Sequence, residues 1–224
     1  MIIKKNDFVE IEYVARVKED NTFFDTTNPL LAEKEGIFSS DEFYGSVIVC
    51  VGKRSFLRAN HWNRCIFGAL PLEGKEVGKV CELEIPPEEA FGKRVPAMVQ
   101  KVSKRHMREK GIFPRVGGLV PAFGRHARIV GEIGDKVIVD MNHPLADKHL
   151  IYTVKIIRIV TQTQEKVEAL KAAWLSKEST IILTGNTLEI FIEGDCSKDK
   201  MMEETCDEIK ELIPDVQAII CRKT

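Results

Sequence analysis

The sequence has no apolar run of membrane-spanning length, which would need about 18 residues. Its first residues, Met1–Asp7, also lack the apolar core of a secretory signal. The 224 residues are 44% hydrophobic and 30% charged, which is typical of a soluble globular chain. We therefore expect a cytoplasmic protein without membrane contact, long enough for one large domain or for two to three small ones.

Patterns that bind metals or phosphates are missing as well. The six cysteines form no Cys-x-x-Cys pair and no zinc spacing, and the five histidines are scattered. Cys50 and Cys81 lie in apolar runs, as small buried side chains of a reducing compartment do. No Gly-Lys-Ser/Thr follows the glycines of the middle region, so no phosphate-binding loop is expected. The sequence predicts no cofactor and no structural metal.

Charge is unevenly distributed along the chain. The net charge is −1, but residues 93–139 carry +8 and residues 161–224 carry −5. A basic segment between acidic ones is informative about partners rather than about fold. Its candidates for contact with ribosomal RNA or an acidic protein are Lys101, Lys104, Arg105, Arg108, Lys110, Arg115, Arg125 and Arg128. A solvated basic face, or docking on the acidic C-terminal region, is the other interpretation.

The first ninety residues have the pattern of a sheet with one short helix. Apolar and polar residues alternate over Phe8–Val17, which predicts a half-buried strand. Asn28, Pro29 and Gly36 are the residue types that cap, begin and stop a short helix. Further strands are expected at Val47–Val51, Val80–Ile85, Val137–Asp140 and Leu150–Ile159.

Two further regions follow. From Lys93, prolines and glycines separate short apolar runs, which indicates a small, mostly β domain of about fifty residues. After Val160 the pattern gives helix, strand, strand, helix, strand, with a tight hairpin at Gly185-Asn186. These elements are expected at 164–177, 180–184, 187–192, 201–213 and 216–221.

Four separated motifs occur in a characteristic order. They are Tyr13, Phe24-Asp25-Thr26-Thr27, Pro86-Pro87-Glu88-Glu89-Ala90-Phe91-Gly92 and Asn142-His143-Pro144-Leu145-Ala146. This order resembles the FKBP-type peptidyl-prolyl isomerases over about residues 7–160. It is most similar to the SlyD-like and archaeal long-type branch, in which a second domain interrupts the FKBP barrel.

The resemblance implies an α+β fold in three parts. Residues 1–92 plus 140–160 would form an FKBP-like antiparallel half-barrel with a short helix. Residues 93–139 would form a β-rich inserted flap domain. Residues 161–224 would form an extra α-β-β-α-β module, which we expect to serve in dimerisation or in docking of a partner.

Isomerisation of an X-Pro bond needs no nucleophile, metal or acid–base pair. Amide resonance sets a barrier of about 18–20 kcal/mol, and an apolar cup that desolvates the amide favours the twisted bond. By resemblance, the cup would be lined by Tyr13, Phe24, Asp25, Val47, Phe56, Leu57, Phe91 and Tyr152. Asp25 would face the amide with the Tyr13 hydroxyl nearby, and the backbone N–H of Leu57 would hold a substrate carbonyl. Phe91 stands where many FKBPs have tyrosine.

The chain departs from the family pattern between Arg54 and Pro71, where the tryptophan that floors the cup is normally found. About eight residues are extra there by comparison with the family pattern. Trp62 would serve as a substitute floor, or the segment His61–Cys65 would form a new recognition loop. Two functions therefore remain open. One is a prolyl isomerase, and the other is a weakly active or inactive binding protein for a dedicated partner.

The inserted domain suggests a chaperone role by the same resemblance. In SlyD-like proteins this domain holds unfolded chains through an exposed apolar surface. Here that surface would be supplied by Met107, Ile112, Phe113, Val116, Leu119, Val120 and Phe123. The alternative is that these side chains fill a small core. The expected partners are unfolded or proline-containing polypeptides.

Overall fold

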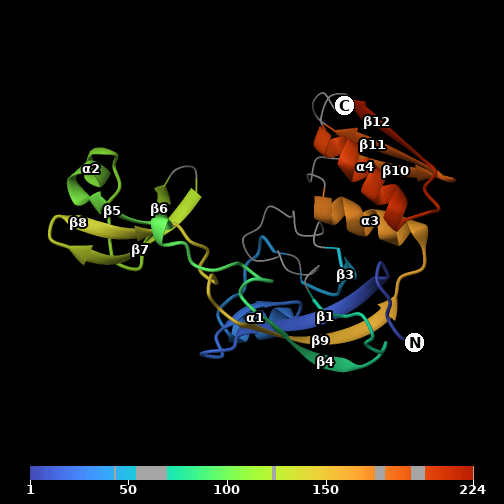
Figure 1. Cartoon of the computed structure of the whole chain (residues 1–224), viewed down its shortest axis with the longest axis horizontal. Coiled ribbons are helices and arrows are strands. Elements are labelled where there is room, and N and C mark those ends of the chain that lie inside the picture. Colours follow the sequence, from blue (N-terminus) through green and yellow to red (C-terminus); the bar gives the residue numbers. More distant parts are fainter. Residues whose placement is uncertain (43, 54–69, 123–124, 175–179, 193–199, 224) are drawn as a thin grey trace. The chain divides into compact units, whose positions relative to one another are not determined.

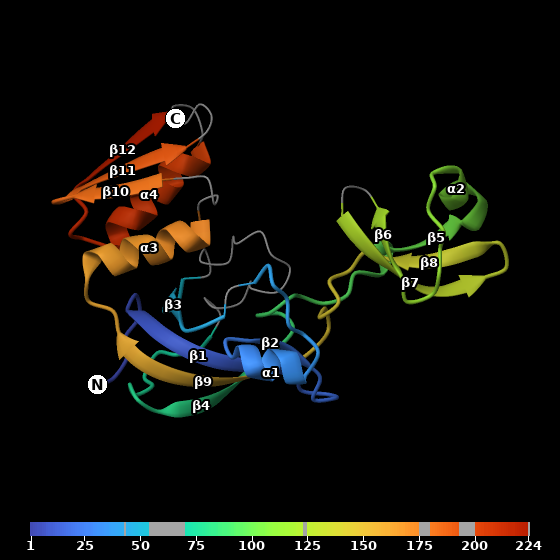
Figure 2. The same ribbon diagram turned by 180° about the vertical axis from the view of Figure 1, so that it is seen from behind.

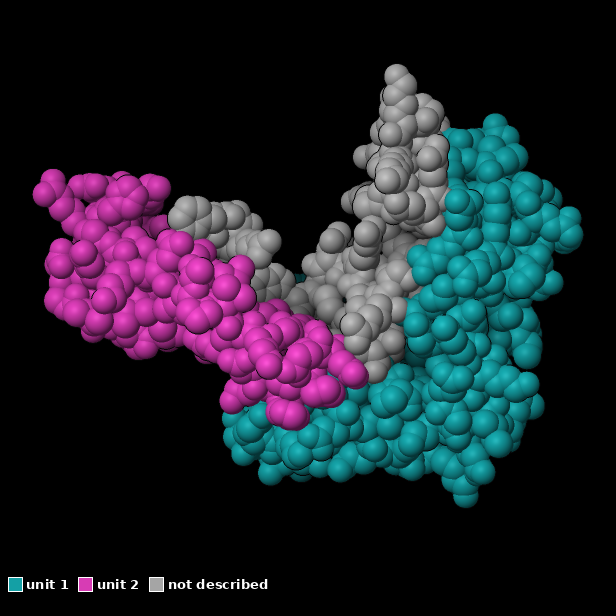
Figure 3. Space-filling model, in the orientation of Figure 1, with its two compact units in different colours: residues 1–85, 150–224 teal, residues 86–149 magenta. Residues whose placement is uncertain are grey.

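The computed structural model describes residues 1–42, 44–53, 70–122, 125–174, 180–192 and 200–223. The chain divides into two compact units, residues 1–85 with 150–224 and residues 86–149, coloured separately in Figure 3. Antiparallel sheets with a few short helices confirm the α+β class. The three-part division expected from the sequence stays a prediction. None of the described helices is long and apolar enough to cross a membrane.

The main sheet of the first unit is antiparallel and is built around β1 (Phe8–Val17) and β9 (Leu150–Ile159). The strand order is β2-β1-β9-β4, with β3 also paired to β1 (Figure 1). These outer strands are β2 (Phe23–Thr26), β3 (Val47–Cys50) and β4 (Val80–Ile85). Residues at every second position of β1 are buried, so the expected alternation is confirmed.

Helix α1 (Pro29–Lys34) follows β2 directly, and its start is fixed by its sequence. The Asn28 side-chain oxygen accepts hydrogen bonds from the backbone N–H groups of Leu30 and Leu31, at 3.0 and 3.2 Å. Gly36 has a φ of 70°, the left-handed conformation that ends a helix at low cost in glycine. The predicted cap, first residue and stop are confirmed.

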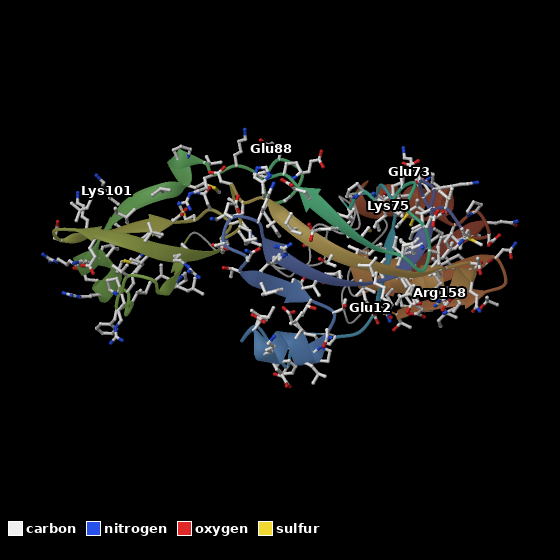
Figure 4. The ribbon with its side chains drawn as sticks, turned by 90° about the horizontal axis from the view of Figure 1, so that it is seen from below. Glu12, Glu73, Lys75, Glu88, Lys101 and Arg158 are labelled. Carbon is white, nitrogen blue, oxygen red and sulfur yellow. The ribbon has the colours of Figure 1, made fainter. Side chains whose placement is uncertain are left out.

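The outer face of the main sheet carries cross-strand ion pairs. Nζ of Lys155 on β9 lies 3.1 Å from Oε2 of Glu12 on β1. Nη2 of Arg16 on β1 lies 3.0 Å from Oε2 of Glu82 on β4. Figure 4 labels Glu12 on this sheet. Each pair is solvent-exposed and contributes little to stability. This part of the face is therefore solvated, and the alternate residues Ile11, Tyr13 and Ala15 of β1 are buried.

The C-terminal module of the first unit consists of α3 (Thr163–Trp174), β10 (Thr180–Thr184), β11 (Thr187–Ile192), α4 (Lys200–Leu212) and β12 (Ala218–Lys223). β10 and β11 form an antiparallel hairpin at Gly185, and β12 runs parallel to β11. Both ribbon views show α3 and α4 beside this three-stranded sheet (Figures 1 and 2). The last strand begins two residues later than expected, because Val216 lies in a turn closed by a hydrogen bond to Ile213.

The module shares one hydrophobic core with the main sheet. Phe8 of β1 and Cys50 of β3 cluster with buried residues of α3 and α4, among them Leu170 and Leu212. Lys166 lies over the ring of Phe8, 5.7 Å from its centroid. Burial of this much apolar surface makes the module an integral layer of the first unit.

Two groups of ion pairs reinforce this packing. Arg158 on β9 pairs with both Glu10 on β1 and Glu165 on α3, each at 2.6 Å. Lys53, just beyond β3, pairs with Glu211 on α4 at 2.9 Å and lies 4.0 Å from Glu208. The helices of the module are thus tied to the main sheet at two places.

The described part of the second unit is a four-stranded antiparallel sheet with one short α-helix and one 3-10 turn. Its strand order is β5-β8-β7-β6, and Met107 of α2 packs on a core that includes Ile129 and Val137. The elements are a 3-10 helix η3 (Pro96–Met98), β5 (Val99–Ser103), α2 (Lys104–Glu109), β6 (Leu119–Ala122), β7 (Arg125–Ile133) and β8 (Lys136–Asp140).

Candidate functional site

Tyr13 and Asp25 form the centre of the candidate site. They lie on the paired strands β1 and β2, where Asp25 is directly opposite Ala15. The Tyr13 hydroxyl donates a hydrogen bond of 2.8 Å to Oδ2 of Asp25. Both residues are buried, with Asp25 only 5% exposed. A carboxylate in such surroundings exerts a stronger field on a neighbouring dipole than it would in water.

The two threonines that follow Asp25 fix this geometry. The backbone N–H of Tyr13 donates to Oγ1 of Thr27 at 2.9 Å, and Oγ1 of Thr26 donates to the Tyr13 carbonyl at 3.0 Å. The backbone N–H of Thr27 donates to the same carbonyl at 3.0 Å. The motif Phe24-Asp25-Thr26-Thr27 therefore holds β2 in register with Tyr13, which places the carboxylate beside the phenol.

Two more of the predicted residues form an aromatic wall beside this pair. Tyr152 on β9 is fully buried, and its ring centroid lies 5.7 Å from that of Tyr13. Phe24 packs edge-on against Tyr152 at 5.9 Å. The structure thus brings together four residues that the sequence placed in one site: Tyr13, Phe24, Asp25 and Tyr152.

A cavity of about 340 Å³ opens beside Phe24 and Asp25. Its size falls in the range of about 300–1,000 Å³ that is typical of small-ligand pockets. Its walls are Phe23, Phe24, Asp25, Thr26, Ala32, Ile37, Glu42 and Tyr44. The cavity therefore lies between β2, α1 and the segment that leads to β3.

Ile37, Glu42 and Tyr44 are site residues that sequence reasoning missed. The ring of Tyr44 stacks on Phe38, with centroids 5.1 Å apart, and its hydroxyl accepts a hydrogen bond from the backbone N–H of Ser39 at 2.9 Å. The signal was the presence of three aromatic residues, Phe38, Phe43 and Tyr44, in a segment without helical or strand periodicity. Such residues need a packing partner outside their own segment.

A second cavity, of about 540 Å³, lies on the outer side of the main sheet. Its walls include Glu12, Val14 and Lys155, together with the exposed side chains of Leu30 and Val80. Glu12 and Lys155 pair with each other there. Tyr13 also borders this cavity, between Glu12 and Val14, but Phe24 and Asp25 do not. We assign the candidate site to the cavity beside Asp25.

The remaining residues predicted for the cup are placed as follows. Val47 is half-buried on β3, where it pairs with Ile11 of β1. Phe56, Leu57 and Trp62 lie outside the described residues, as do His61, Arg64 and Cys65. Whether Trp62 floors the cup stays a prediction.

Phe91 belongs to the second unit, on the segment that leads out of β4. Its ring stacks on His143 with centroids 3.9 Å apart and an interplanar angle of 2°. Nδ1 of His143 accepts a hydrogen bond from the backbone N–H of Leu145 at 3.1 Å. The motifs around Phe91 and His143, about fifty residues apart in sequence, therefore meet in the structure.

Asn142 joins the two chain segments that enter and leave the second unit. Its Oδ1 accepts from the backbone N–H of Val95 at 2.8 Å, and its Nδ2 donates to the Val95 carbonyl at 3.2 Å. Nδ2 also donates to Asp140, which pairs with Arg94. The amide thus acts like a strand residue bridging two backbones, which explains why an asparagine stands at this point of the motif.

The predicted apolar surface of the insert is only partly exposed. Phe113, Val116 and Leu119 are exposed, at 77%, 55% and 63%. Val120 and Met107 instead lie in the core, and Ile112 packs against it. These three do not belong to an exposed surface, because the small sheet needs them to cover its one buried face. Phe123 lies outside the described residues.

The basic residues of the insert fall into two groups. Lys104 pairs with Glu132, and Arg105 pairs with Glu109. Five others have no carboxylate within ion-pair distance among the described residues: Lys101, Arg108, Lys110, Arg115 and Arg128. The side chain of Arg125 lies outside the described part of the chain.

Burial and ion pairing shift several pKa values in the first unit. Burial raises the pKa of the Cys50 thiol to about 12, against a smaller opposing effect of Lys53. Hydrogen bonds from Arg158 lower the pKa of Glu165. Across the described ranges, no group of three or more potential metal ligands occurs.

Apolar walls around one buried, hydrogen-bonded carboxylate suit an uncharged ligand group placed next to a fixed negative charge. The chain is 29% identical over 155 residues to the short-type peptidyl-prolyl cis-trans isomerase of Methanocaldococcus jannaschii, covering 69% of this chain and 92% of that relative. It is 35% identical over 105 residues to the FKBP-type isomerase SlyD of Haemophilus influenzae. This match covers 43% of the chain and 52% of SlyD, so the chain spans about half the length of that relative.

A third relative is the FKBP-type 16 kDa peptidyl-prolyl cis-trans isomerase of Escherichia coli strain K12, 29% identical over 93 residues, 39% of this chain and 62% of that protein. No protein-family model matches. The chain belongs to the FKBP-type peptidyl-prolyl isomerase family. The comparisons support the family, and the long-type branch indicated by the motifs stays a prediction.

Proposed function

We propose that this chain is a cytoplasmic peptidyl-prolyl cis-trans isomerase and folding chaperone that acts on X-Pro bonds of unfolded or nascent proteins. In this proposal the main sheet with α1 belongs to the FKBP-like half-barrel, and residues 93–139 of the second unit are its inserted flap domain. The observation that carries the proposal is the buried hydrogen bond between Tyr13 and Asp25, flanked by Phe24 and Tyr152.

The chemistry follows from the loss of amide resonance on twisting. A planar X-Pro amide is well solvated by water, and a twisted one has lost part of its charge separation. An apolar wall of Phe24 and Tyr152 removes water from the amide and so favours the twisted form. The Asp25 carboxylate, oriented by Tyr13, adds a fixed field that acts on the changing amide dipole.

Refolding of a client that is limited by a non-native X-Pro bond tests both activities together. An isomerase shortens the slow phase, whose uncatalysed time constant is on the order of 10–100 s. A chaperone lowers the aggregated fraction. We expect sub-stoichiometric protein to shorten the slow phase. We expect stoichiometric protein to lower the aggregated fraction.

The second candidate function is a non-catalytic FKBP-like scaffold for a dedicated protein partner. The observation that favours it is the departure from the family pattern between Arg54 and Pro71. A lowered aggregated fraction with an unchanged slow phase would select this function. The same result would contradict the catalytic proposal, because the protein would then bind its client without speeding isomerisation of the X-Pro bond.

The second unit is proposed to hold unfolded clients through Phe113, Val116 and Leu119, the exposed apolar side chains between α2 and β6. Exposed apolar surface of this kind marks interaction sites. Replacing Phe113 and Leu119 by serine should abolish aggregation suppression. The matched control is Ile133→Ser, which removes another exposed apolar side chain, at the end of β7. Equal loss in both variants would argue against a localised surface.

Two further partner proposals concern charge and assembly. The cations of the insert that have no carboxylate neighbour in the described ranges would contact ribosomal RNA or an acidic protein, and such binding must weaken steeply between low and moderate salt. RNA binding that does not weaken with salt would contradict phosphate contacts.

The C-terminal module would mediate a dimer, which sedimentation of the whole chain tests directly.

A further inference from the structure

Cys206 and Cys221 face each other inside the C-terminal module. Cys206 lies on α4 and Cys221 on β12, and their sulfur atoms are 3.8 Å apart. Cys206 shares one helix face with Ile209, which is buried in the core, and Cys221 is in register with the buried Ile190 of β11. The two thiols therefore meet where helix and sheet pack together.

Both thiols are also within reach of a small reagent. Each residue is partly exposed, in contrast to Cys50, which is completely buried. Among the described residues, neither Cys50 nor Cys81 has a cysteine neighbour of this kind. The pair thus combines proximity with access, which the other described cysteines do not.

We propose that Cys206 and Cys221 form a reversible intramolecular disulfide that locks α4 onto β12 when the chain meets an oxidant of the disulfide class, such as oxidised glutathione. A sulfur separation of 3.8 Å needs only small side-chain rotations to reach the S–S bond length of about 2.05 Å. The bond closes a loop between two elements that already pack on each other.

The reaction is a pair of thiol–disulfide exchanges. Burial and the nearby Cys221 raise the pKa of Cys206 to about 12, and a raised pKa disfavours the thiolate that attacks a disulfide. We therefore assign the first attack on the reagent to Cys221. This step forms a mixed disulfide at Cys221 and releases one reagent thiolate, which takes up a proton. Cys206 then loses its proton and attacks the Cys221 sulfur, which releases the second reagent thiol. One reagent disulfide is reduced to two thiols, and two protein thiols are oxidised to one disulfide.

The lock would act on a helix that also holds the main sheet. Glu208 and Glu211, which pair with Lys53, follow Cys206 on α4 within two turns. A crosslink restricts the unfolded chain and so stabilises the native state. Oxidation should therefore raise the thermal stability of the C-terminal module and of the core it shares with β1 and β3.

The test is oxidation of the whole chain by graded ratios of oxidised to reduced glutathione. Free thiols are counted, cysteine-containing peptides are mapped by mass spectrometry, and the melting temperature is recorded. We expect the loss of two thiols, a peptide that joins Cys206 to Cys221, and a higher melting temperature that dithiothreitol reverses. Cys221→Ser and Cys206→Ala should each abolish the shift, whereas Cys81→Ser should retain it.

Three results would overturn the proposal. One is a linked peptide that joins other cysteines in place of this pair. Another is stable glutathione adducts on Cys221 without ring closure. The third is an oxidised Cys206–Cys221 form whose melting temperature equals that of the reduced chain. If one serine or alanine variant fails to fold, the other variant and the peptide map of the unaltered chain still decide.

Discussion

The hydrogen bond from Tyr13 to Asp25 joins two side chains that an unfolded chain would leave in water. Both are buried, and the hydroxyl groups of Thr26 and Thr27 form hydrogen bonds with the backbone of Tyr13. This arrangement keeps a carboxylate in apolar surroundings, where burial is costly, and the hydrogen bond from Tyr13 offsets part of that cost. Pre-organisation for an amide substrate is the physical reason that we give for it.

Removal of either partner should lower catalysis without unfolding the chain. We expect Asp25→Ala and Tyr13→Phe each to reduce kcat/KM for a short X-Pro peptide several-fold, because the field on the amide is lost or misdirected. Asp41→Ala, which removes an exposed carboxylate of the α1–β3 segment, is the matched control and should leave kcat/KM unchanged. Equal kcat/KM in all three variants would show that Asp25 takes no part in catalysis.

The buried thiol of Cys50 leads to a prediction about how stability depends on pH. Its pKa is about 12 in the folded chain, whereas an exposed thiol ionises near pH 9. Above about pH 9 the unfolded state therefore binds fewer protons than the native state, so stability falls as the pH rises towards 12. Denaturant unfolding at pH 7 to 11 should show a smaller decline for Cys50→Ala than for the unaltered chain. An equal decline in the free energy of unfolding for both chains would show that ionisation of Cys50 does not contribute to the pH dependence.

Among the elements, α1 and β1 illustrate what local sequence can predict. The alternation over Phe8–Val17 and the cap at Asn28 act through residues close in sequence, and both were predicted correctly. The packing of Phe8 and Cys50 on α3 and α4 was not predictable, because nothing in a strand's alternation identifies which layer covers it. The same holds for Val120, which is buried in a core to which α2 contributes Met107.

Arg158 connects three elements, and its loss should weaken the attachment of α3. Arg158→Met should lower the melting temperature more than Lys155→Met, which removes a single exposed pair on the same strand. Arg158 is labelled in Figure 4. Because Arg158 lowers the pKa of Glu165, its benefit is present above the unfolded pKa of that glutamate and disappears as the pH falls through the folded pKa. A difference between the two variants that persists in acid would contradict this origin.

At the scale of the whole molecule, the register of β4 and β9 suggests how the second unit was accommodated. Ile85 and Leu150 are directly opposite each other in the antiparallel pair, and residues 86–149 leave and return between them. A chain that lacks this unit needs only a two-residue turn at that point. The first unit also retains its own core.

Replacement of residues 86–149 by Asn-Gly should therefore give a chain that folds cooperatively. We expect it to keep the thermal unfolding of the first unit and to lose the suppression of client aggregation. Circular dichroism and an aggregation assay measure the two properties. A replacement chain that is unfolded would show that the second unit is needed for the stability of the first, and retained suppression would place client binding elsewhere.

The four site residues predicted correctly as neighbours come from motifs whose order is specific to a family, and not from local pattern. Taken alone, Tyr13 and Phe24 have the pattern of ordinary core residues, and only the joint order of the motifs pointed to one site. Ile37, Glu42 and Tyr44 were missed, since their segment has no periodicity that predicts a cavity. The meeting of Cys206 and Cys221 depends on the packing of α4 against β12, which cysteine spacing does not reveal.

The central claim is that this chain twists X-Pro bonds. The most direct measurement is NMR exchange between the cis and trans forms of a short X-Pro peptide with catalytic amounts of the whole chain. Uncatalysed exchange takes tens to hundreds of seconds, so free peptide gives no exchange peaks on the one-second scale. We expect exchange peaks with the unaltered chain that weaken markedly with Asp25→Ala. Peptide resonances that broaden on binding, with no exchange between the isomers, would contradict it.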